Sequence, residues 1–302
     1  LKQKDKWKRG LPYVGNKGQN AQKIIDILPE GKRLVDVFGG GGSITLTAAS
    51  SGKWDDVVYN DRRKTVVGLL HSLLSDNPHV NLMDYTYMDR DQFFDWRDNK
   101  PDSIERTLIL IVWSFSNNLR DYLYGKSVEK QKLQLTRALF WGDTGTFLDD
   151  LYEYAKDEPS ISGKYKAFNK WRRDKMHLSS RYDLLQQLQR LEQLERLQQL
   201  ELIQQLQRPE QIKYSALDYR SLSIKPSDVV YCDPPYTGTS KDYGGFNDGE
   251  FQEWIANCPA KKIYISEYSI LPNTEVVAQL GTKHSFTSSG KRPQELLLKY
   301  LK

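Results

Sequence analysis

The chain has 302 residues, 38% hydrophobic and 27% charged, which is the balance of a soluble globular protein with one large domain and an insertion, or with two domains. Two cysteines and four scattered histidines exclude a disulfide framework and argue against a metal site, and no apolar run reaches the roughly 20 residues of a membrane span. A formal charge of +5 and an aromatic content of 12% favour a polyanionic partner.

The N-terminus is polar and lacks the apolar core of a signal peptide, which predicts a cytoplasmic protein. Residues 11–18 are predicted to form a loop, because glycine and proline interrupt regular structure, and the apolar spacing after it predicts a helix over residues 20–28. An aromatic residue and a lysine ahead of a helix are suited to holding an anionic group. An N-terminal arm that only docks is the alternative.

A buried strand predicted over residues 33–38 runs into four glycines, Ser43 and a helical stretch. Strand, glycine turn and helix form the first unit of a nucleotide-binding half-sheet, because glycine lets a ligand approach the backbone closely. Neither the P-loop nor the dinucleotide motif fits, since no Gly-Lys-Ser/Thr follows and Ile44 stands at the third glycine position. For any single glycine a plain tight turn is the alternative.

The next predicted strand, residues 56–61, ends in Asp61 about 20 positions after the glycines. An acid at this position accepts hydrogen bonds from ribose hydroxyls in such folds, although Asp61 is also suited to capping the helix that follows. Loop, strand and acid together indicate a nucleoside ligand without a phosphate clamp.

A mostly helical section is predicted from Asn77 to about Pro209, and residues 107–115 within it read as a buried helix or strand. The polar loop that follows carries asparagine and arginine, the side chains that read adenine and guanine edges. An ordinary polar loop is the alternative. The candidate DNA contacts of this loop are Asn117, Asn118, Arg120, Tyr122 and Lys126.

Residues 164–181 carry many cations and few acids, with Tyr165, Phe168 and Trp171 between them. Cations with interleaved aromatics are typical of contact with a phosphate backbone, and a solvated helix face is the alternative. The candidate DNA contacts here are Lys170, Arg172 and Arg173.

A tract of low complexity, residues 185–206, has an apolar residue at every third position. All its residue types favour helix, but a period of three makes the apolar stripe wander around an α-helix. We expect a helix packed on several sides, with a less regular coil as the alternative. A dimerising coiled coil would need a heptad, so we expect a monomer or a weak dimer.

The sheet is predicted to resume after Pro209, with strands over residues 211–214 and 262–266, a helix over residues 250–255, and a final edge strand or hairpin partner over residues 294–300. The strand at residues 229–232 ends at Asp233. Because prolines follow, the carboxylate is held rigidly at the carboxyl end of a buried strand, where open α/β sheets bind ligands.

Several motifs resemble those of the Dam-type, D12-class DNA adenine-specific methyltransferases. Asp233-Pro234-Pro235-Tyr236 matches the catalytic motif of that family without change. The family's N-terminal motif is Gly-Gly-Lys, and Asn16 replaces its second glycine here. The further resemblances are the cofactor loop Phe38-Gly39-Gly40-Gly41-Gly42-Ser43, the acid Asp61, the pair Asp218-Tyr219, and the closing Lys291, Arg292 and Glu295.

The resemblance implies an α/β fold, namely a Rossmann-like methyltransferase sheet that is discontinuous in sequence and has a mostly helical inserted target-recognition domain. It divides the chain into a first catalytic part, residues 1–84, the insertion, residues 85–209, and a second catalytic part, residues 210–302.

The implied activity is methyl transfer from S-adenosylmethionine to the 6-amino group of a flipped adenine in double-stranded DNA, which leaves S-adenosylhomocysteine and needs no metal. Asp233 and the Pro234 carbonyl would accept the hydrogens of the amine, with Pro235 stiffening the turn and Tyr236 stacking on the base. The implied cofactor contacts are Tyr13, Gly15, Lys17, Asp36, Phe38, Gly39, Gly40, Gly41, Asp61, Asp218, Tyr219 and Asp233.

A cognate restriction endonuclease, in a bacterial or phage-infected cell, is the implied protein partner. Two other classes stay open. A methyltransferase of the same chemistry for RNA or a protein amide is one, although asparagine in place of Asp233 would suit the amide and the basic insertion favours nucleic acid. A catalytically silent DNA-binding protein is the other, and the intact tetrapeptide and glycine loop speak against it.

Overall fold

The computed structural model describes residues 10–142, 150–176, 190–206, 209–235, 246–282 and 294–302. The chain forms two compact units. We call the first the sheet unit, which comprises Leu1–Gly10, Gly15–His71 and Leu206–Lys302, and the second the helical unit, which comprises Leu11–Val14 and Ser72–Gln205. Among the described residues, none of the helices has the length and apolar character that a membrane crossing requires.

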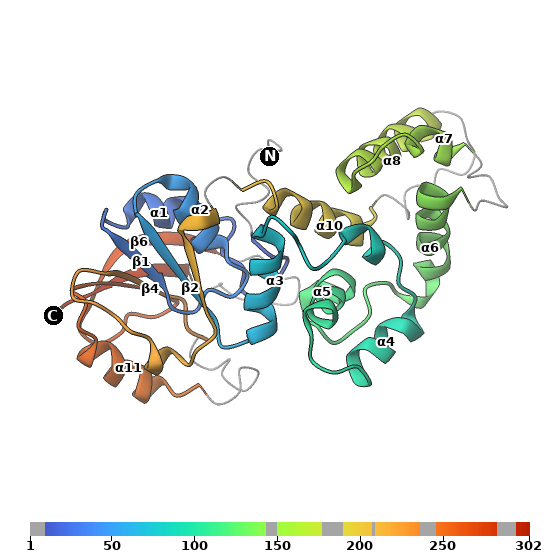
Figure 1. Ribbon diagram of the computed structural model, residues 1–302. Helices are drawn as coiled ribbons and strands as arrows, with labels where there is room; N and C mark the ends of the chain where they lie inside the picture. Colours follow the sequence, from blue (N-terminus) through green and yellow to red (C-terminus); the bar gives the residue numbers. More distant parts are fainter. Residues whose placement is uncertain (1–9, 143–149, 177–189, 207–208, 236–245, 283–293) are drawn as a thin grey trace. The chain divides into compact units, whose positions relative to one another are not determined.

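A seven-stranded sheet in the order β3-β2-β1-β4-β5-β7-β6 forms the centre of the sheet unit (Figure 1). The strands from β3 to β5 are parallel, and β7 runs antiparallel to both of its neighbours. The strand order therefore reverses between β1 and β4. The strands are β1 (Arg33–Asp36), β2 (Asp56–Asn60), β3 (Ile212–Ser215), β4 (Val229–Cys232), β5 (Lys262–Glu267), β6 (Thr274–Thr282) and β7 (Gln294–Tyr300).

Helices cover both faces of this sheet, with α1 (Ala21–Ile27) and α2 (Ser43–Ser51) on one side and α11 (Asp248–Asn257) on the other (Figure 1). All four residues of β4 are buried, as expected for a central parallel strand that is covered on both faces. Phe251 and Ile255 of α11 pack into one core cluster with residues of β1, β4 and β5. The short 3-10 helices of this unit are η5 (Pro209–Gln211) and η6 (Tyr219–Ser221).

Strand β7 corrects one expectation from the sequence. It lies between β5 and β6, so the prediction of an edge strand is wrong and that of a hairpin partner is confirmed. The edge strand at this end of the sheet is β6, which the sequence does not predict because most of its residues are exposed or half-buried and it lacks the buried apolar run of the other strands. Two register shifts, between Val276 and Ala278 and between Gln279 and Gly281, interrupt its pairing with β7.

The helical unit confirms the predicted helical section, and the apolar residues 107–113 form the buried part of a helix, not a strand. Ser103 begins that helix, because its hydroxyl accepts the Arg106 amide at 3.1 Å. Helix α3 (Lys64–Leu74) begins in the sheet unit and ends in this one. The other described elements are η3 (Leu82–Tyr85), α4 (Arg90–Asp98), α5 (Ile104–Trp113), η4 (Phe115–Asn117), α6 (Lys126–Trp141), α7 (Leu151–Ala155), α8 (Ile161–Met176) and α10 (Glu192–Ile203).

The described part of the period-three tract is helix α10, as expected, and residues 185–189 lie outside the described residues. Three residues of an α-helix advance about 300°, so each leucine of the tract is displaced by about 60° from the one before it. Leu194 and Ile203 therefore lie on opposite sides, yet both are fully buried. Arg196 donates to the carbonyls of α5 at 2.8 Å, and Tyr165 of α8 donates to Glu195 at 2.6 Å. The helix is thus enclosed by its neighbours.

We expect Leu194→Ala and Ile203→Ala to lower the free energy of unfolding by similar amounts, about 2–5 kcal/mol each, because each truncation leaves a cavity in a packed interior. Urea denaturation followed by far-ultraviolet circular dichroism measures both values. Gln205→Ala, at an exposed position beyond the helix end, is the control and should stay within about 0.5 kcal/mol of wild type. A large effect at Leu194 with none at Ile203 would confine the buried surface to one side.

Candidate active site

The carboxyl ends of four adjacent strands each carry an acid: Asp61 follows β2, Asp36 ends β1, Asp233 follows β4 and Glu267 ends β5. Neighbouring parallel strands end at the same edge of a sheet, and ligands bind where the strand order reverses. The sequence analysis missed Glu267, although an acid directly after the predicted strand 262–266 is the same signal that identified Asp61. In the part of the chain that the structure describes, no group of His, Cys, Asp or Glu is arranged to hold a metal ion.

The glycine loop lies against the neighbouring strand. A Cβ added at Gly39 would lie 2.3 Å from the ring of Tyr59, which only glycine avoids. The Tyr59 hydroxyl donates to the Gly40 carbonyl at 2.7 Å, and the Gly40 amide donates to the Asp61 carboxylate at 3.0 Å. Gly42 has a φ of 76°, in the left-handed region that favours glycine. Close packing, as well as the turn itself, therefore requires these glycines.

Asp36 is 1% exposed and lies at the end of β1. One of its oxygens accepts the Thr45 hydroxyl at 2.7 Å, and the other, Oδ1, has no hydrogen-bond partner among the described residues. Burial raises the pKa of Asp36 to about 7, and the negative charges of Asp233 and Asp61 act in the same direction. A buried acceptor of this kind is suited to a cation or a hydrogen-bond donor that comes with a ligand.

Aromatic side chains line the loop region on the α11 side. The ring of Phe38 lies 5.3 Å from that of Tyr219, and Tyr219 meets Trp254 at the same centroid distance. Asp218 accepts from the Arg220 guanidinium at 2.8 Å, and Arg220 also reaches Glu250 at 2.6 Å. The predicted pair Asp218-Tyr219 thus stands beside the predicted loop residue Phe38, with Asp218 held by an ion pair.

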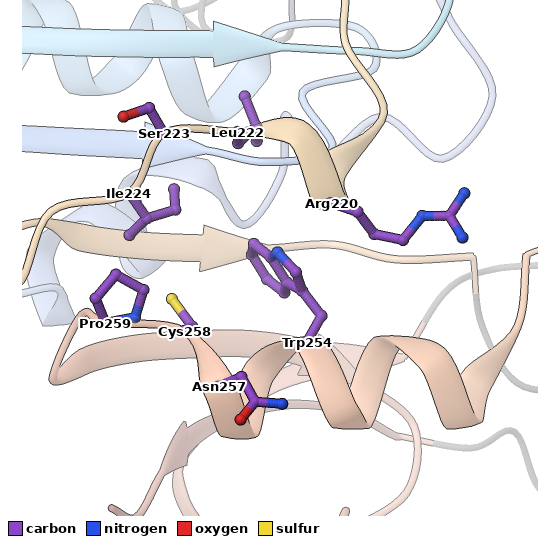
Figure 2. A pocket seen from close by; sticks show the side chains of 8 residues that line it. All are labelled: Arg220, Leu222, Ser223, Ile224, Trp254, Asn257, Cys258 and Pro259. Atoms are coloured by element: carbon purple, nitrogen blue, oxygen red, sulfur yellow. The ribbon is translucent and has the colours of Figure 1, made fainter.

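A surface pocket of about 320 Å³ lies between residues 220–224 and the end of α11, residues 254–259 (Figure 2). In Figure 2 the guanidinium of Arg220 points away from Cys258 and Pro259 at the other end. The predicted cofactor residues do not line this pocket. It is therefore separate from the acids at the strand ends.

Lys17 is the cation of the strand-end site. Its side chain is 4% exposed, and Nζ lies 2.9 Å from Asp233 Oδ1 and 2.5 Å from Glu295 Oε1. Burial opposes the charged form, but the carboxylates of Asp233 and Glu295 outweigh it and raise the pKa of Lys17. The sequence predicts a cofactor contact for Lys17 and does not predict this pair of carboxylate partners.

The loop around Lys17 is fixed by its own hydrogen bonds. Asn16 Oδ1 accepts the Gly18 amide at 2.7 Å and the Ser43 hydroxyl at 2.6 Å, which ties the loop to the start of α2. The Lys17 carbonyl accepts two amides at the start of α1, both at 2.8 Å. Asn16, which departs from the family motif, therefore has a structural role that glycine cannot supply.

The remaining predicted site residues differ in where the structure places them. Gly15 has a φ of 78°, while Tyr13 belongs to the helical unit. Tyr236, like Lys291 and Arg292, lies outside the described residues. Pro234 is buried and Pro235 half-buried directly after Asp233, so the described part of the tetrapeptide is held against the sheet.

Comparison with known proteins shows which family has a sequence like that of this chain. The D12 class N6 adenine-specific DNA methyltransferase family matches residues 13–257, which is most of the chain. The chain belongs to this family. A type II methyltransferase of Haemophilus parahaemolyticus, M2.HphI, is 23% identical over 251 residues, covering 78% of this chain and 68% of the relative. The sheet described above is consistent with the fold of S-adenosylmethionine-dependent methyltransferases.

In this D12-class methyltransferase, the predicted DNA contacts lie in the helical unit. Residues 114–122 form a small hairpin, which we call the recognition loop, closed by an antiparallel bridge between Ser114 and Tyr122. Ser116, Asn117 and Leu119 have positive φ angles of 51°, 59° and 59°. Such strained conformations persist where surrounding structure enforces them, and they cluster at functional sites.

Side chains of the recognition loop divide into structural and exposed ones. Asn118 accepts the Arg120 and Asp121 amides at 2.9 Å, so it shapes the turn. The Arg120 side chain is 76% exposed, and Lys126 lies exposed just beyond the loop. Tyr122 is 5% exposed and donates to the Met88 carbonyl at 2.8 Å, so the structure places this predicted DNA contact in the core.

The basic helix α8 also divides by face. Phe168 and Trp171 are buried, and Trp171 donates to Asp150 at 2.7 Å, so these two aromatics pack inside the unit and do not lie ready to stack on bases, while Tyr165 is half-buried. Lys170 and Arg173 are exposed, and Arg172 is half-buried. The helical spacing separates the two kinds of residue, which the linear sequence shows side by side.

Asp36 gives a testable pH dependence. Its pKa is 3.8 in the unfolded chain and about 7 in the folded one, so stability falls as the pH rises through this range and the buried carboxyl ionises. Asp36→Asn should therefore be more stable than wild type by about 2–4 kcal/mol at pH above 7, and the gain should shrink toward pH of about 4. Urea denaturation across this pH range measures it.

The exposed Asp26→Asn is the matched control, and its free energy of unfolding should stay within about 0.5 kcal/mol of wild type. An Asp36→Asn effect that is independent of pH would contradict the assignment, because it would show that folding does not shift the pKa of this carboxyl.

Proposed function

We propose that this enzyme transfers a methyl group from S-adenosylmethionine to the 6-amino group of an adenine flipped out of double-stranded DNA. The observation that carries the proposal is the position of Asp233-Pro234-Pro235 at the carboxyl end of β4, beside β1 with its glycine loop and at the reversal of strand order. Membership of the adenine-specific family names the base and the nitrogen.

The residues at the strand ends fit this cofactor. Asp36 offers a buried oxygen for the ammonium group, and Asp61 beside the glycine loop is suited to the ribose hydroxyls. Phe38 and Tyr219 supply aromatic surface for the adenine ring. A glycine loop without a phosphate-binding lysine agrees with a nucleoside that carries no phosphate.

When bound, the cofactor supplies the methyl group: the adenine N6 lone pair forms the new N–C bond, the electron pair of the broken C–S bond stays on sulfur, and one N6 proton is released to solvent. The lone pair is conjugated with the ring, so the amine must be oriented and polarised. Asp233 and the Pro234 carbonyl accept its hydrogens, which draws electron density onto nitrogen. Positioning and electrostatic stabilisation of this kind lower a barrier by several kcal/mol.

Base flipping requires contacts to the rest of the DNA, and we propose that the helical unit provides them. Removing a base from the duplex costs a few kcal/mol, which contacts to the remaining DNA must offset. We assign sequence reading to the recognition loop, with Asn117 and Arg120, and backbone contact to Lys126 and the exposed cations of α8. The Haemophilus relative is called a type II methyltransferase, and we propose the same class here. The endonuclease partner stays a prediction.

Asp233→Ala tests the catalytic assignment. Wild-type protein incubated with cofactor labelled on the methyl group and with plasmid DNA should label adenine, and the variant should lose at least about 100-fold in rate because the amine is no longer polarised. Cofactor binding, measured by calorimetry, should largely persist. Asp26→Ala, at an exposed position of α1, is the control and should keep full activity. Labelling of cytosine, RNA or protein in place of adenine would contradict the proposal.

The exposed cations of α8 allow a second test. Lys170→Ala and Arg173→Ala should weaken binding to all DNA sequences alike and reduce the slope of log affinity against log salt by about 1 each, because each phosphate contact releases a counterion. Arg120→Ala should instead change which sequences are methylated. Fluorescence anisotropy over a salt series measures the first, and single-molecule sequencing of methylated DNA the second. Lys262→Ala, an exposed cation of the sheet unit, serves as control.

A further inference from the structure

The Asp233 carboxylate is held by a buried ion triad, which consists of Asp233, Lys17 and Glu295. Lys17 Nζ lies 2.9 Å from Asp233 Oδ1 and 2.5 Å from Glu295 Oε1. The Lys17 and Glu295 side chains are 4% and 1% exposed, so solvent screens these contacts little. The Asp233 side chain is the most open of the three, at 16% exposed. The triad therefore presents one carboxylate toward a ligand and keeps its other members inside.

We propose that Lys17 and Glu295 are positioning residues for the methyl-transfer step, with Lys17 orienting the Asp233 carboxylate and Glu295 balancing the charge of Lys17. This inference rests on the proposed function. It assigns to the lysine of the N-terminal loop a role in the reactivity of the adenine amine, in place of the cofactor contact that the sequence predicts.

The first support is rigidity. Lys17 belongs to a loop that is tied to α1 and α2 by backbone and side-chain hydrogen bonds. The second oxygen of Glu295, Oε2, accepts the Asn20 side-chain amide at 3.2 Å, and Glu295 is part of β7 in the interior of the sheet. Each member of the triad thus comes from a different, fixed segment, so the contacts restrict the Asp233 carboxylate in several directions.

The second support is the surrounding charge. Asp36 and Glu267 end the strands on either side of β4, and burial, with the negative charge of Asp233 adding to it, raises the pKa of both. Without a cation, so many buried carboxylates would favour protonation, and a protonated Asp233 would be a poor acceptor for the amine. Lys17 contacts Asp233 directly and keeps its carboxylate charged.

The third support is the net charge of the triad. With Lys17 charged and both acids ionised, the three groups carry one negative charge. Methyl transfer moves positive charge onto the adenine nitrogen, so a negative site stabilises the transition state more than the ground state. Without Glu295, the charge of Lys17 would cancel that of Asp233, and the site would stabilise the positive charge of the transition state less. A net negative triad therefore needs both carboxylate partners of Lys17.

The test uses the whole chain with plasmid DNA and labelled cofactor, and it measures single-turnover rate and cofactor affinity separately. Concentrations are normalised to cofactor-binding sites, so loss of folded protein does not count as loss of rate. We expect Lys17→Met to lower the rate about 100-fold and Lys17→Arg to recover at least a tenth of the wild-type rate, with cofactor Kd changed less than about 3-fold in both. Glu295→Gln should lower the rate about 10-fold, because it removes the charge that balances Lys17. The loss should be smaller than in Lys17→Met, because the amide oxygen of glutamine can still accept a hydrogen bond from Lys17.

Lys23→Met is the matched control, because Lys23 is exposed on α1 and its ammonium group donates to the Gln279 carbonyl at 2.6 Å, outside the triad. Its rate should equal that of wild type. If Lys17→Met does not fold, Lys17→Arg and Glu295→Gln decide the question alone, and a wild-type rate in Glu295→Gln overturns the proposal.

Other outcomes separate the possible failures. Loss of cofactor affinity in Lys17→Met, in proportion to the loss of rate, would make Lys17 a cofactor ligand and overturn the inference. An unchanged rate in Lys17→Met would also overturn it. If wild-type enzyme itself transfers no methyl group to adenine in DNA, the proposed function fails first, and that result is visible before any variant is compared.

Discussion

Parallel strands that end at one edge of a sheet bring their terminal side chains together, and in this protein those side chains are acids. Asp36, Asp233 and Glu267 end three consecutive strands in a region that excludes most water. Their mutual repulsion would protonate some of them unless a cation were present. Lys17 provides that cation from a separate loop. The rest of the site depends on this balance, because the proposed reaction needs an ionised carboxylate beside an amine.

The N-terminal loop consequently contacts the acids at the strand ends, and in the proposed function it forms part of the active site. Asn16 fixes the loop to the start of α2 through Ser43, and Lys17 reaches from it to the residue after β4. The same Ser43 follows the glycines. A single short segment therefore connects the glycine loop with Asp233, and the Asn16 side chain makes a part of that connection that glycine could not make.

In the helical unit, polar and apolar residues that are close together in the sequence lie on different faces of the same helix. The aromatics of α8 fill the interior while Lys170 and Arg173 stay outside. The leucines of α10 use the helical rotation to bury several sides of one helix. Both patterns place the stability of the unit in its interior and leave the recognition loop and the exposed cations on the surface, where the proposed DNA contacts need them.

Local signals in the sequence were sufficient for the buried strands, the glycine loop, Asp61 and the Asp-Pro-Pro-Tyr motif, because such strands and their turns are defined by contiguous residues, whereas strand β6, which is exposed or half-buried over most of its length, was missed. The position of β7 between β5 and β6, the burial of Tyr122 and the partners of Lys17 were not predictable. Each depends on which distant segments pack together. The sequence by itself determined which chemical groups are available at the strand ends, and the tertiary structure decided which of them touch, since ion pairing and burial arise only when segments far apart along the chain are brought within a few ångströms.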